Sequence, residues 1–160
     1  MNEHKHAHLA GEKPGSHTNQ TILMAIFFLV WIVDSFLLRY TTFLFETFMW
    51  LSLIPAVIII VGAIYLMDRS HKDLFDSETE GLATNGVYGR VRNPMYLGTF
   101  LFYVGLAIAT FSLASLAVCC IIFPYYNMLA SYEEGKLYEK FGGSFLEYKK
   151  QVRKWIPVKK

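Results

Sequence analysis

The segment GVYGRVRNPMYLG, residues 86–98, decides how this chain folds, because it separates two strongly apolar halves. It carries Arg90 and Arg92. The Asn93-Pro94 step keeps residue 93 out of helical conformation and predicts a helix that starts near Pro94. An apolar run follows at once, so the segment places charged side chains directly before a helix that suits a membrane.

Composition also favours a membrane protein. The 160 residues are 54% hydrophobic and 18% charged, whereas a soluble domain has about a quarter charged residues. The net charge of +2 gives no support to nucleic-acid binding. Cys119 and Cys120 are adjacent, so they form neither a disulfide framework nor a metal site, and we assign no metal. We predict an all-α integral membrane helical bundle in one domain, residues 21–160.

Apolar runs predict about four transmembrane helices, each near the ~20 residues that cross a ~30 Å hydrocarbon core. The third and fourth form a hairpin, because one long apolar region is split at residues 111–114. The helices are expected at about residues 21–38, 43–67, 95–111 and 114–131, with a flexible polar tail at 1–20, a loop at 68–94 and a C-terminal segment at 132–160.

Basic residues predict the orientation. Only Arg39 lies in the loop after the first helix, whereas Arg69, Lys72, Arg90 and Arg92 lie between the second and third, and eight more follow the fourth. The positive-inside rule makes the face with the central loop and both termini cytoplasmic.

Polar residues in the tail and spans have ordinary explanations. The histidines of HKHAH, residues 4–8, can trap a metal ion, but no further ligands are visible and a solvated tail is favoured. Asp34 is the one acid inside a span, and intramembrane acids are often functional. We favour a snorkelling or hydrogen-bonded structural acid. Polar groups, Asn127 among them, line the cytoplasmic half of the fourth helix beyond Pro124.

The C-terminal segment predicts two more helical pieces. Residues 133–141 continue the fourth helix up to Gly142-Gly143. SFLE, residues 144–147, has the pattern of a capping box that starts another helix. That helix is amphipathic and basic, which is typical of an anionic membrane surface, and it can also cover a site. Its apolar side comprises Phe145, Tyr148, Val152 and Trp155.

The hairpin brings two charged places together. Arg90 and Arg92 precede the third helix, and Glu133-Glu134 end the fourth. Arginine or helix amides suit a carboxylate, glutamate suits an ammonium or hydroxyls, and tyrosine suits an aromatic base. The pocket therefore fits an amphoteric cofactor, and it would open sideways onto lipid. The alternative is that the arginines are topology anchors and the glutamates a solvated helix face.

These motifs resemble a known family. LATNGVYGRVRNPMYLG, then two apolar spans, then EEGKLYEKFGGSFLEYKKQVRKWIP, is similar to the isoprenylcysteine carboxyl methyltransferase-like superfamily of integral membrane methyltransferases, including its phospholipid methyltransferase branch. The resemblance covers about half the chain, roughly residues 84–157. Asn93 replaces a histidine found in many members, and Phe145 replaces a tyrosine. The matching residues are Gly86, Tyr88, Arg92, Pro94, Tyr96, Gly98, Glu133, Glu134, Leu137, Phe141, Gly142 and Tyr148.

The resemblance implies a site and a reaction. It implies S-adenosylmethionine as cofactor and methyl transfer to a prenylcysteine-like carboxylate, a phospholipid amine or a thiol. Arg92 and Glu134 are the expected catalytic residues. Asn93 can hydrogen-bond but cannot act as an acid or base near neutral pH. The expected cofactor-binding residues are Tyr88, Asn93, Pro94, Tyr96, Gly98, Glu133 and Glu134.

Several alternatives stay open. Gly98 also suits helix–helix packing. An NADPH-dependent membrane reductase has a similar architecture, but no basic cluster for a 2′-phosphate is visible. A non-catalytic scaffold would not need the intact Arg92, Tyr96, Glu133 and Glu134. The likeness to bacterial members implies a prokaryotic inner membrane, with membrane lipids and a lipidated or small-molecule acceptor as partners.

Overall fold

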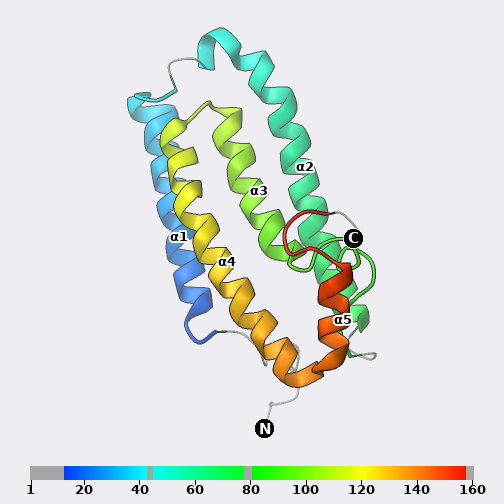
Figure 1. The fold of residues 1–160 in the computed structure, drawn as a ribbon. Coiled ribbons are helices and arrows are strands. Elements are labelled where there is room, and N and C mark those ends of the chain that lie inside the picture. The colour runs from blue at the N-terminus through cyan, green and yellow to red at the C-terminus, as the bar shows by residue number, and fades with distance from the viewer. Residues whose placement is uncertain (1–12, 43–44, 78–80, 158–160) are drawn as a thin grey trace.

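The computed structural model describes residues 13–42, 45–77 and 81–157, and these residues are all-α (Figure 1). This confirms the predicted fold class. No strand occurs in these ranges, where the isolated backbone bridge pairs Val91 with Arg153. The elements are α1 (Ser16–Ile32), the π-helical η2 (Val33–Leu38), α2 (Phe45–Ser77), α3 (Pro94–Ala109), α4 (Leu113–Phe141) and α5 (Gly143–Gln151).

Three helical segments are long and apolar enough to cross a membrane: Ser16–Leu38, Trp50–Phe75 and Leu113–Phe141. The chain is therefore an integral membrane protein. α3 is apolar but has 16 residues, which gives a length of about 24 Å against a hydrocarbon core of ~30 Å. It lies between α2 and α4, and both continue past its start (Figure 1). A complete crossing by α3 remains a prediction.

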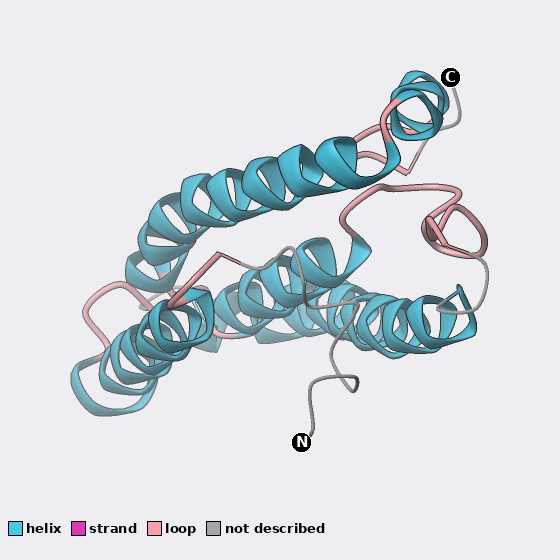
Figure 2. Ribbon diagram, turned by 90° about the horizontal axis from the view of Figure 1, so that it is seen from below, coloured by secondary structure: helices cyan, strands magenta, loops and turns pink. Residues whose placement is uncertain are grey.

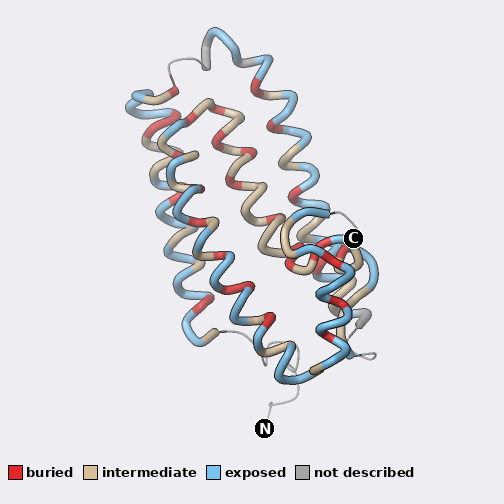
Figure 3. Tube along the Cα trace, in the orientation of Figure 1, coloured by how far each residue is buried: buried red, intermediate tan, exposed pale blue. Residues whose placement is uncertain are grey.

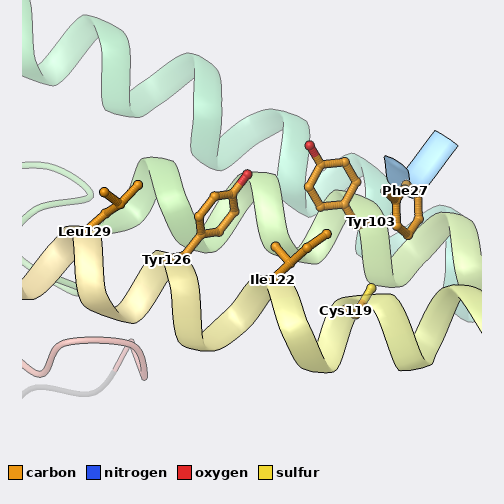
Figure 4. Packing of buried hydrophobic residues seen from close by; sticks show 6 residues of the cluster. All are labelled: Phe27, Tyr103, Cys119, Ile122, Tyr126 and Leu129. Atoms are coloured by element: carbon orange, nitrogen blue, oxygen red, sulfur yellow. The ribbon is translucent and has the colours of Figure 1, made fainter. Parts of the chain in front are cut away.

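The core lies between α4, α3 and α1. α3 packs most extensively along α2, while α1 packs on α4. Outward positions such as Leu37, Trp50 and Leu51 are at least 70% exposed, and Figure 3 shows such exposed positions along the outer sides of α1 and α2. An apolar outer surface is what a lipid environment requires. The core side chains, seen in Figure 4, are Phe27, Tyr103, Cys119, Ile122, Tyr126 and Leu129.

The bounds of the first two helices differ from expectation. α1 begins at Ser16, inside the expected tail, and residues 1–12 with the HKHAH histidines lie outside the described residues. α2 continues through the polar residues 68–77, so the expected loop 68–94 is shorter. The extension is polar but helical, because ion pairs one turn apart support it. These pairs are Arg69–Asp73 and Lys72–Asp68.

The C-terminal helices follow the prediction in part. α4 continues through Glu133 and ends at Gly142, which has φ 53°, as predicted. The capping box is wrong. The residue before α5 is Gly142, no side chain caps the helix, and Glu147 accepts hydrogen bonds from Lys150 and Gln151 instead.

α5 packs against the rest of the protein through its apolar side. It lies beyond the end of α4 when the bundle is viewed from below (Figure 2). Phe145, Tyr148 and Val152 are buried against Leu82, Leu137 and Phe141. The apolar side of this helix is therefore not available to a membrane surface. Trp155 lies after the helix ends at Gln151.

A cluster of hydrogen-bonded polar residues lies at the end of the bundle opposite α5 (Figure 1). The buried Asp34 carboxylate accepts hydrogen bonds from the amide and hydroxyl of Thr41 and, at 2.6 Å, from the hydroxyl of Ser112. Ser112 also caps α4 by accepting from the Ser115 amide. The prediction of a hydrogen-bonded structural acid is confirmed. Asp34, in the first turn of η2, thus joins η2 to Thr41 and to the turn between α3 and α4.

Candidate active site

The loop before α3 is fixed from α2. The Asp73 carboxylate accepts a hydrogen bond from the Val87 amide at 2.8 Å and pairs with Arg69 at 3.1 Å. Gly86 has φ 57°, and a Cβ there would lie 2.0 Å from Asp73 Oδ2. Only glycine suits both the backbone and the space. Asp73 thereby sets where the following residues, up to Arg92, can lie.

Arg92 and Glu134 form a two-point ion pair. Arg92 Nε lies 3.1 Å from Glu134 Oε1, and Arg92 Nη2 lies 3.2 Å from Oε2. Both side chains are 9% exposed. Asn93 Nδ2 donates to the same Oε1 at 2.9 Å. The sequence prediction that the segment before α3 meets Glu134 across the hairpin is confirmed. The geometry is the two-pronged one that favours arginine over lysine.

The other donors of Arg92 reach the C-terminal segment. Nη1 donates to the carbonyl oxygens of Val152 at 2.6 Å and Lys149 at 3.3 Å, and the Arg92 amide donates to the Arg153 carbonyl at 3.0 Å. Arg92 therefore joins the loop before α3, α4 and the chain after α5. This role goes beyond that of a topology anchor.

A second carboxylate lies one residue away on α4. The Tyr96 hydroxyl donates to Glu133, and the Tyr96 ring lies 5.4 Å from that of Tyr126. Glu133 is half-buried, while Glu134 is buried. Successive residues of a helix point in different directions. Glu133 thus faces Tyr96 on α3, and Glu134 faces Arg92.

Two tyrosines complete the cluster. The Tyr148 hydroxyl donates to the Tyr88 carbonyl at 2.7 Å, which holds α5 on the loop. Burial, with the charges of Glu133 and Asp73, raises the pKa of Tyr88 to about 12. Burial also raises the pKa of Tyr148. Both phenols stay protonated near neutral pH, and that of Tyr148 is a hydrogen-bond donor.

Gly98, one of the expected cofactor-binding residues, lies close to α2. A Cβ on Gly98 would lie 2.8 Å from Met67 Cγ and 3.0 Å from the Ala63 carbonyl oxygen, both on α2. Gly98 therefore allows α3 to approach α2, which was the alternative explanation. Pro94 is buried as the first residue of α3.

Sequence reasoning did not assign Asp73, Tyr148 or the Val152 carbonyl to the site. Tyr148 belongs to the C-terminal motif, so its match was a usable signal. No signal in the sequence pointed to Asp73, because its partner is a backbone amide.

Among the described residues no group of three histidine, cysteine or acidic side chains could hold a metal ion. A surface hollow on α2 between Ile64 and Phe75 includes none of the expected site residues.

The model of the phospholipid methyltransferase family matches residues 49–144. The chain belongs to this family. The matched span contains every expected site residue of the family resemblance from Tyr88 to Glu134. The relationship to the isoprenylcysteine methyltransferase-like superfamily is thereby confirmed. No solved structure matches the chain significantly.

Members of the wider superfamily are similar to this chain. Protein-S-isoprenylcysteine O-methyltransferase A of Arabidopsis thaliana is 30% identical over 118 residues, which are 68% of this chain and 60% of the relative. The Schizosaccharomyces pombe enzyme of that name is 31% identical over 78 residues, 48% of this chain and 33% of the relative. The human enzyme is 30% identical over 82 residues, which are 51% of this chain and 29% of the relative. The chain thus covers between 29% and 60% of these relatives' lengths, less than two thirds in each case.

Proposed function

We propose that this protein transfers a methyl group from S-adenosylmethionine to a membrane-associated acceptor at the cytoplasmic face of the membrane. One observation carries the proposal. In a chain of this family, two successive glutamates of α4 meet the region where α3 begins: Arg92, just before α3, pairs with Glu134, and Tyr96, in the first turn of α3, donates to Glu133. The basic loop and C-terminal segment support the cytoplasmic assignment of that end.

The side chains present fit the proposed cofactor. The half-buried Glu133 suits an ammonium or ribose hydroxyls, and the rings of Tyr88 and Tyr96 suit an adenine. Asn93 supplies an amide near the start of α3, where free backbone amides favour a carboxylate. When bound, S-adenosylmethionine supplies an electrophilic methyl group on a sulfonium. Gly98 faces α2, and we leave it out of this set.

Arg92 and Glu134 have a different part in this proposal. Each is the other's main partner, and Asn93 adds a further hydrogen bond to Glu134. Hydrogen bonds from within the protein thus occupy both oxygens of Glu134. We therefore assign Arg92 and Glu134 to holding the loop in place, with the Arg92 charge available to a nearby carboxylate.

The acceptor decides whether a base is needed. A carboxylate or a thiolate attacks directly, so the protein has only to align it and exclude water. An amine must first lose a proton, and Glu133 is then the base, because Glu134 is held by Arg92. We favour a prenylcysteine-like carboxylate, because three relatives carry the name isoprenylcysteine O-methyltransferase. A phospholipid amine is the second candidate, because of the family's description.

The test uses purified protein in nanodiscs. S-adenosylmethionine or its demethylated product should stabilise the protein against heat, by about 2.7 kcal/mol at a hundredfold excess over Kd. Labelled methyl groups should then appear in a farnesylated cysteine, in phosphatidylethanolamine or in a small thiol, supplied separately. Stabilisation by NADPH and not by the methyl donor would replace the proposal with the reductase alternative.

A further inference from the structure

The chain after α5 forms a strap, defined here as Val152–Ile156, that runs from the site to α4. At its start it is bound by Arg92, through the Val152 carbonyl at 2.6 Å and the Arg153 carbonyl at 3.0 Å. Figure 1 shows this segment in red beside the loop that precedes α3. The strap lies outside residues 49–144, so the family match does not describe it.

The far end of the strap is held on α4, where Asn127 makes most of the hydrogen bonds. The Asn127 side-chain oxygen accepts hydrogen bonds from Lys154 Nζ at 2.8 Å and from Trp155 Nε1 at 3.0 Å. Lys154 also donates to the Asn127 carbonyl at 3.0 Å and to the Ser131 hydroxyl at 2.7 Å. Two successive strap residues thus share a single acceptor atom.

Aromatic packing completes this attachment. The Trp155 ring lies 5.3 Å from that of Phe123 on α4, which lies 5.0 Å from that of Phe100 on α3. Phe123 and Asn127 are one turn apart on α4, so they present one face to the strap. The polar and aromatic contacts therefore fix both the position and the direction of Trp155.

The two ends of the strap are mechanically connected. Only Arg153 lies between Val152, whose carbonyl accepts from Arg92, and Lys154, whose ammonium donates to Asn127. Because this connection is short, we expect Arg92 to lose its Val152 and Arg153 contacts if the strap leaves α4. The Val152 carbonyl holds the guanidinium that also pairs with Glu134, and the Arg153 carbonyl holds the Arg92 backbone amide.

We propose that Asn127 is a positioning residue: by anchoring Lys154 and Trp155, it holds the strap against α4 and so keeps Arg92 on Glu134 in the cofactor site. The inference rests on the proposed function and adds a residue that lies outside the expected set of site residues. Asn127 is exposed, so no burial requirement accounts for it.

Two substitutions at this position have opposite expected effects. Asn127→Leu has a similar volume and no acceptor, so both strap side chains lose their shared oxygen. Asn127→Asp keeps the acceptor and adds a charge that attracts Lys154. Tyr138→Leu, at an exposed position of the same helix, is the control.

The measurements are hydrogen exchange and ligand binding. The Arg92 amide donates to Arg153, so its exchange reports strap docking without any ligand. Asn127→Leu should speed exchange in residues 86–98 and 152–157 and weaken binding of S-adenosylhomocysteine roughly 10-fold, for two lost hydrogen bonds. Asn127→Asp should exchange no faster than wild type and bind at least as tightly, and the control should match wild type.

Two outcomes overturn the inference. In one, Asn127→Leu leaves exchange of the Arg92 peptide unchanged, so Asn127 does not hold the strap. In the other, exchange rises but ligand affinity matches wild type, so the strap does not position the site. A wild-type protein that binds neither S-adenosylmethionine nor S-adenosylhomocysteine refutes the proposed function, while the exchange rates still decide whether Asn127 holds the strap.

Discussion

Breaking the Arg92–Glu134 pair from one side should destabilise the protein strongly. Glu134→Ala removes both oxygens that accept from Arg92 and the one that accepts from Asn93. It leaves an arginine side chain that is 9% exposed without its counter-charge. Removing one partner of a buried pair costs about 3–5 kcal/mol.

The pair also predicts strong non-additivity. The Arg92→Met and Glu134→Leu double variant has no uncompensated charge, so it should be more stable than the sum of its single variants by about 2 kcal/mol or more. Glu134→Gln keeps one acceptor for Arg92 Nε and should lie between wild type and Glu134→Ala.

The assay is equilibrium unfolding of the protein in detergent micelles, followed by the loss of helical circular dichroism. Wild type, Arg92→Met, Glu134→Leu and the double variant are all measured without ligand, so the result does not depend on the proposed function. Single-variant costs below about 1 kcal/mol, the range of exposed ion pairs, would refute the buried two-point pair. So would simple additivity in the double variant.

Three further predictions test other parts of the structure. Gly98→Val should lower stability by about 1–3 kcal/mol, because its Cβ meets Met67 at 2.8 Å; a thermal midpoint equal to wild type would contradict that packing. Asp34→Ala should cost about 2–3 kcal/mol, because Thr41 and Ser112 lose the carboxylate that accepts their hydrogen bonds, while the Kd for S-adenosylhomocysteine stays unchanged, because Asp34 lies at the opposite end of the bundle. Tyr88 keeps its proton up to a pKa of about 12 when folded and releases it near 10 when unfolded. Its contribution to stability is therefore complete below pH 10 and lost between pH 10 and 12; absorbance titration of Tyr88→Phe should lack one of the late-titrating phenols of the wild type, and an unchanged curve would contradict this.

Local sequence patterns predicted that Arg92 and Glu134 lie close together. A proline at the start of α3, a short hairpin and a glycine stop after Phe141 are sequence features, and together they bring Arg92 near Glu134. Hydropathy placed the spans but missed the end of α2, because residues 68–77 are helical through ion pairs rather than through apolar character.

The contacts made by backbone groups could not be predicted. Asp73 binds the amide of Val87, and Arg92 binds the carbonyl of Val152, and neither interaction depends on the partner's side chain. The periodicity that put Trp155 on the apolar side of α5 assumed that the helix continued. It ends at Gln151, and Trp155 packs on Phe123 instead.

The most direct test of the central claim is transfer of a labelled methyl group from S-adenosylmethionine by the purified protein in nanodiscs. A farnesylated cysteine should acquire the label as a base-labile ester. Glu133→Gln, which leaves the Arg92–Glu134 pair intact, should reduce S-adenosylmethionine binding about 10-fold or more through the lost charge. No label in any of the three acceptors, from a folded protein that binds neither S-adenosylmethionine nor its product, would contradict the account.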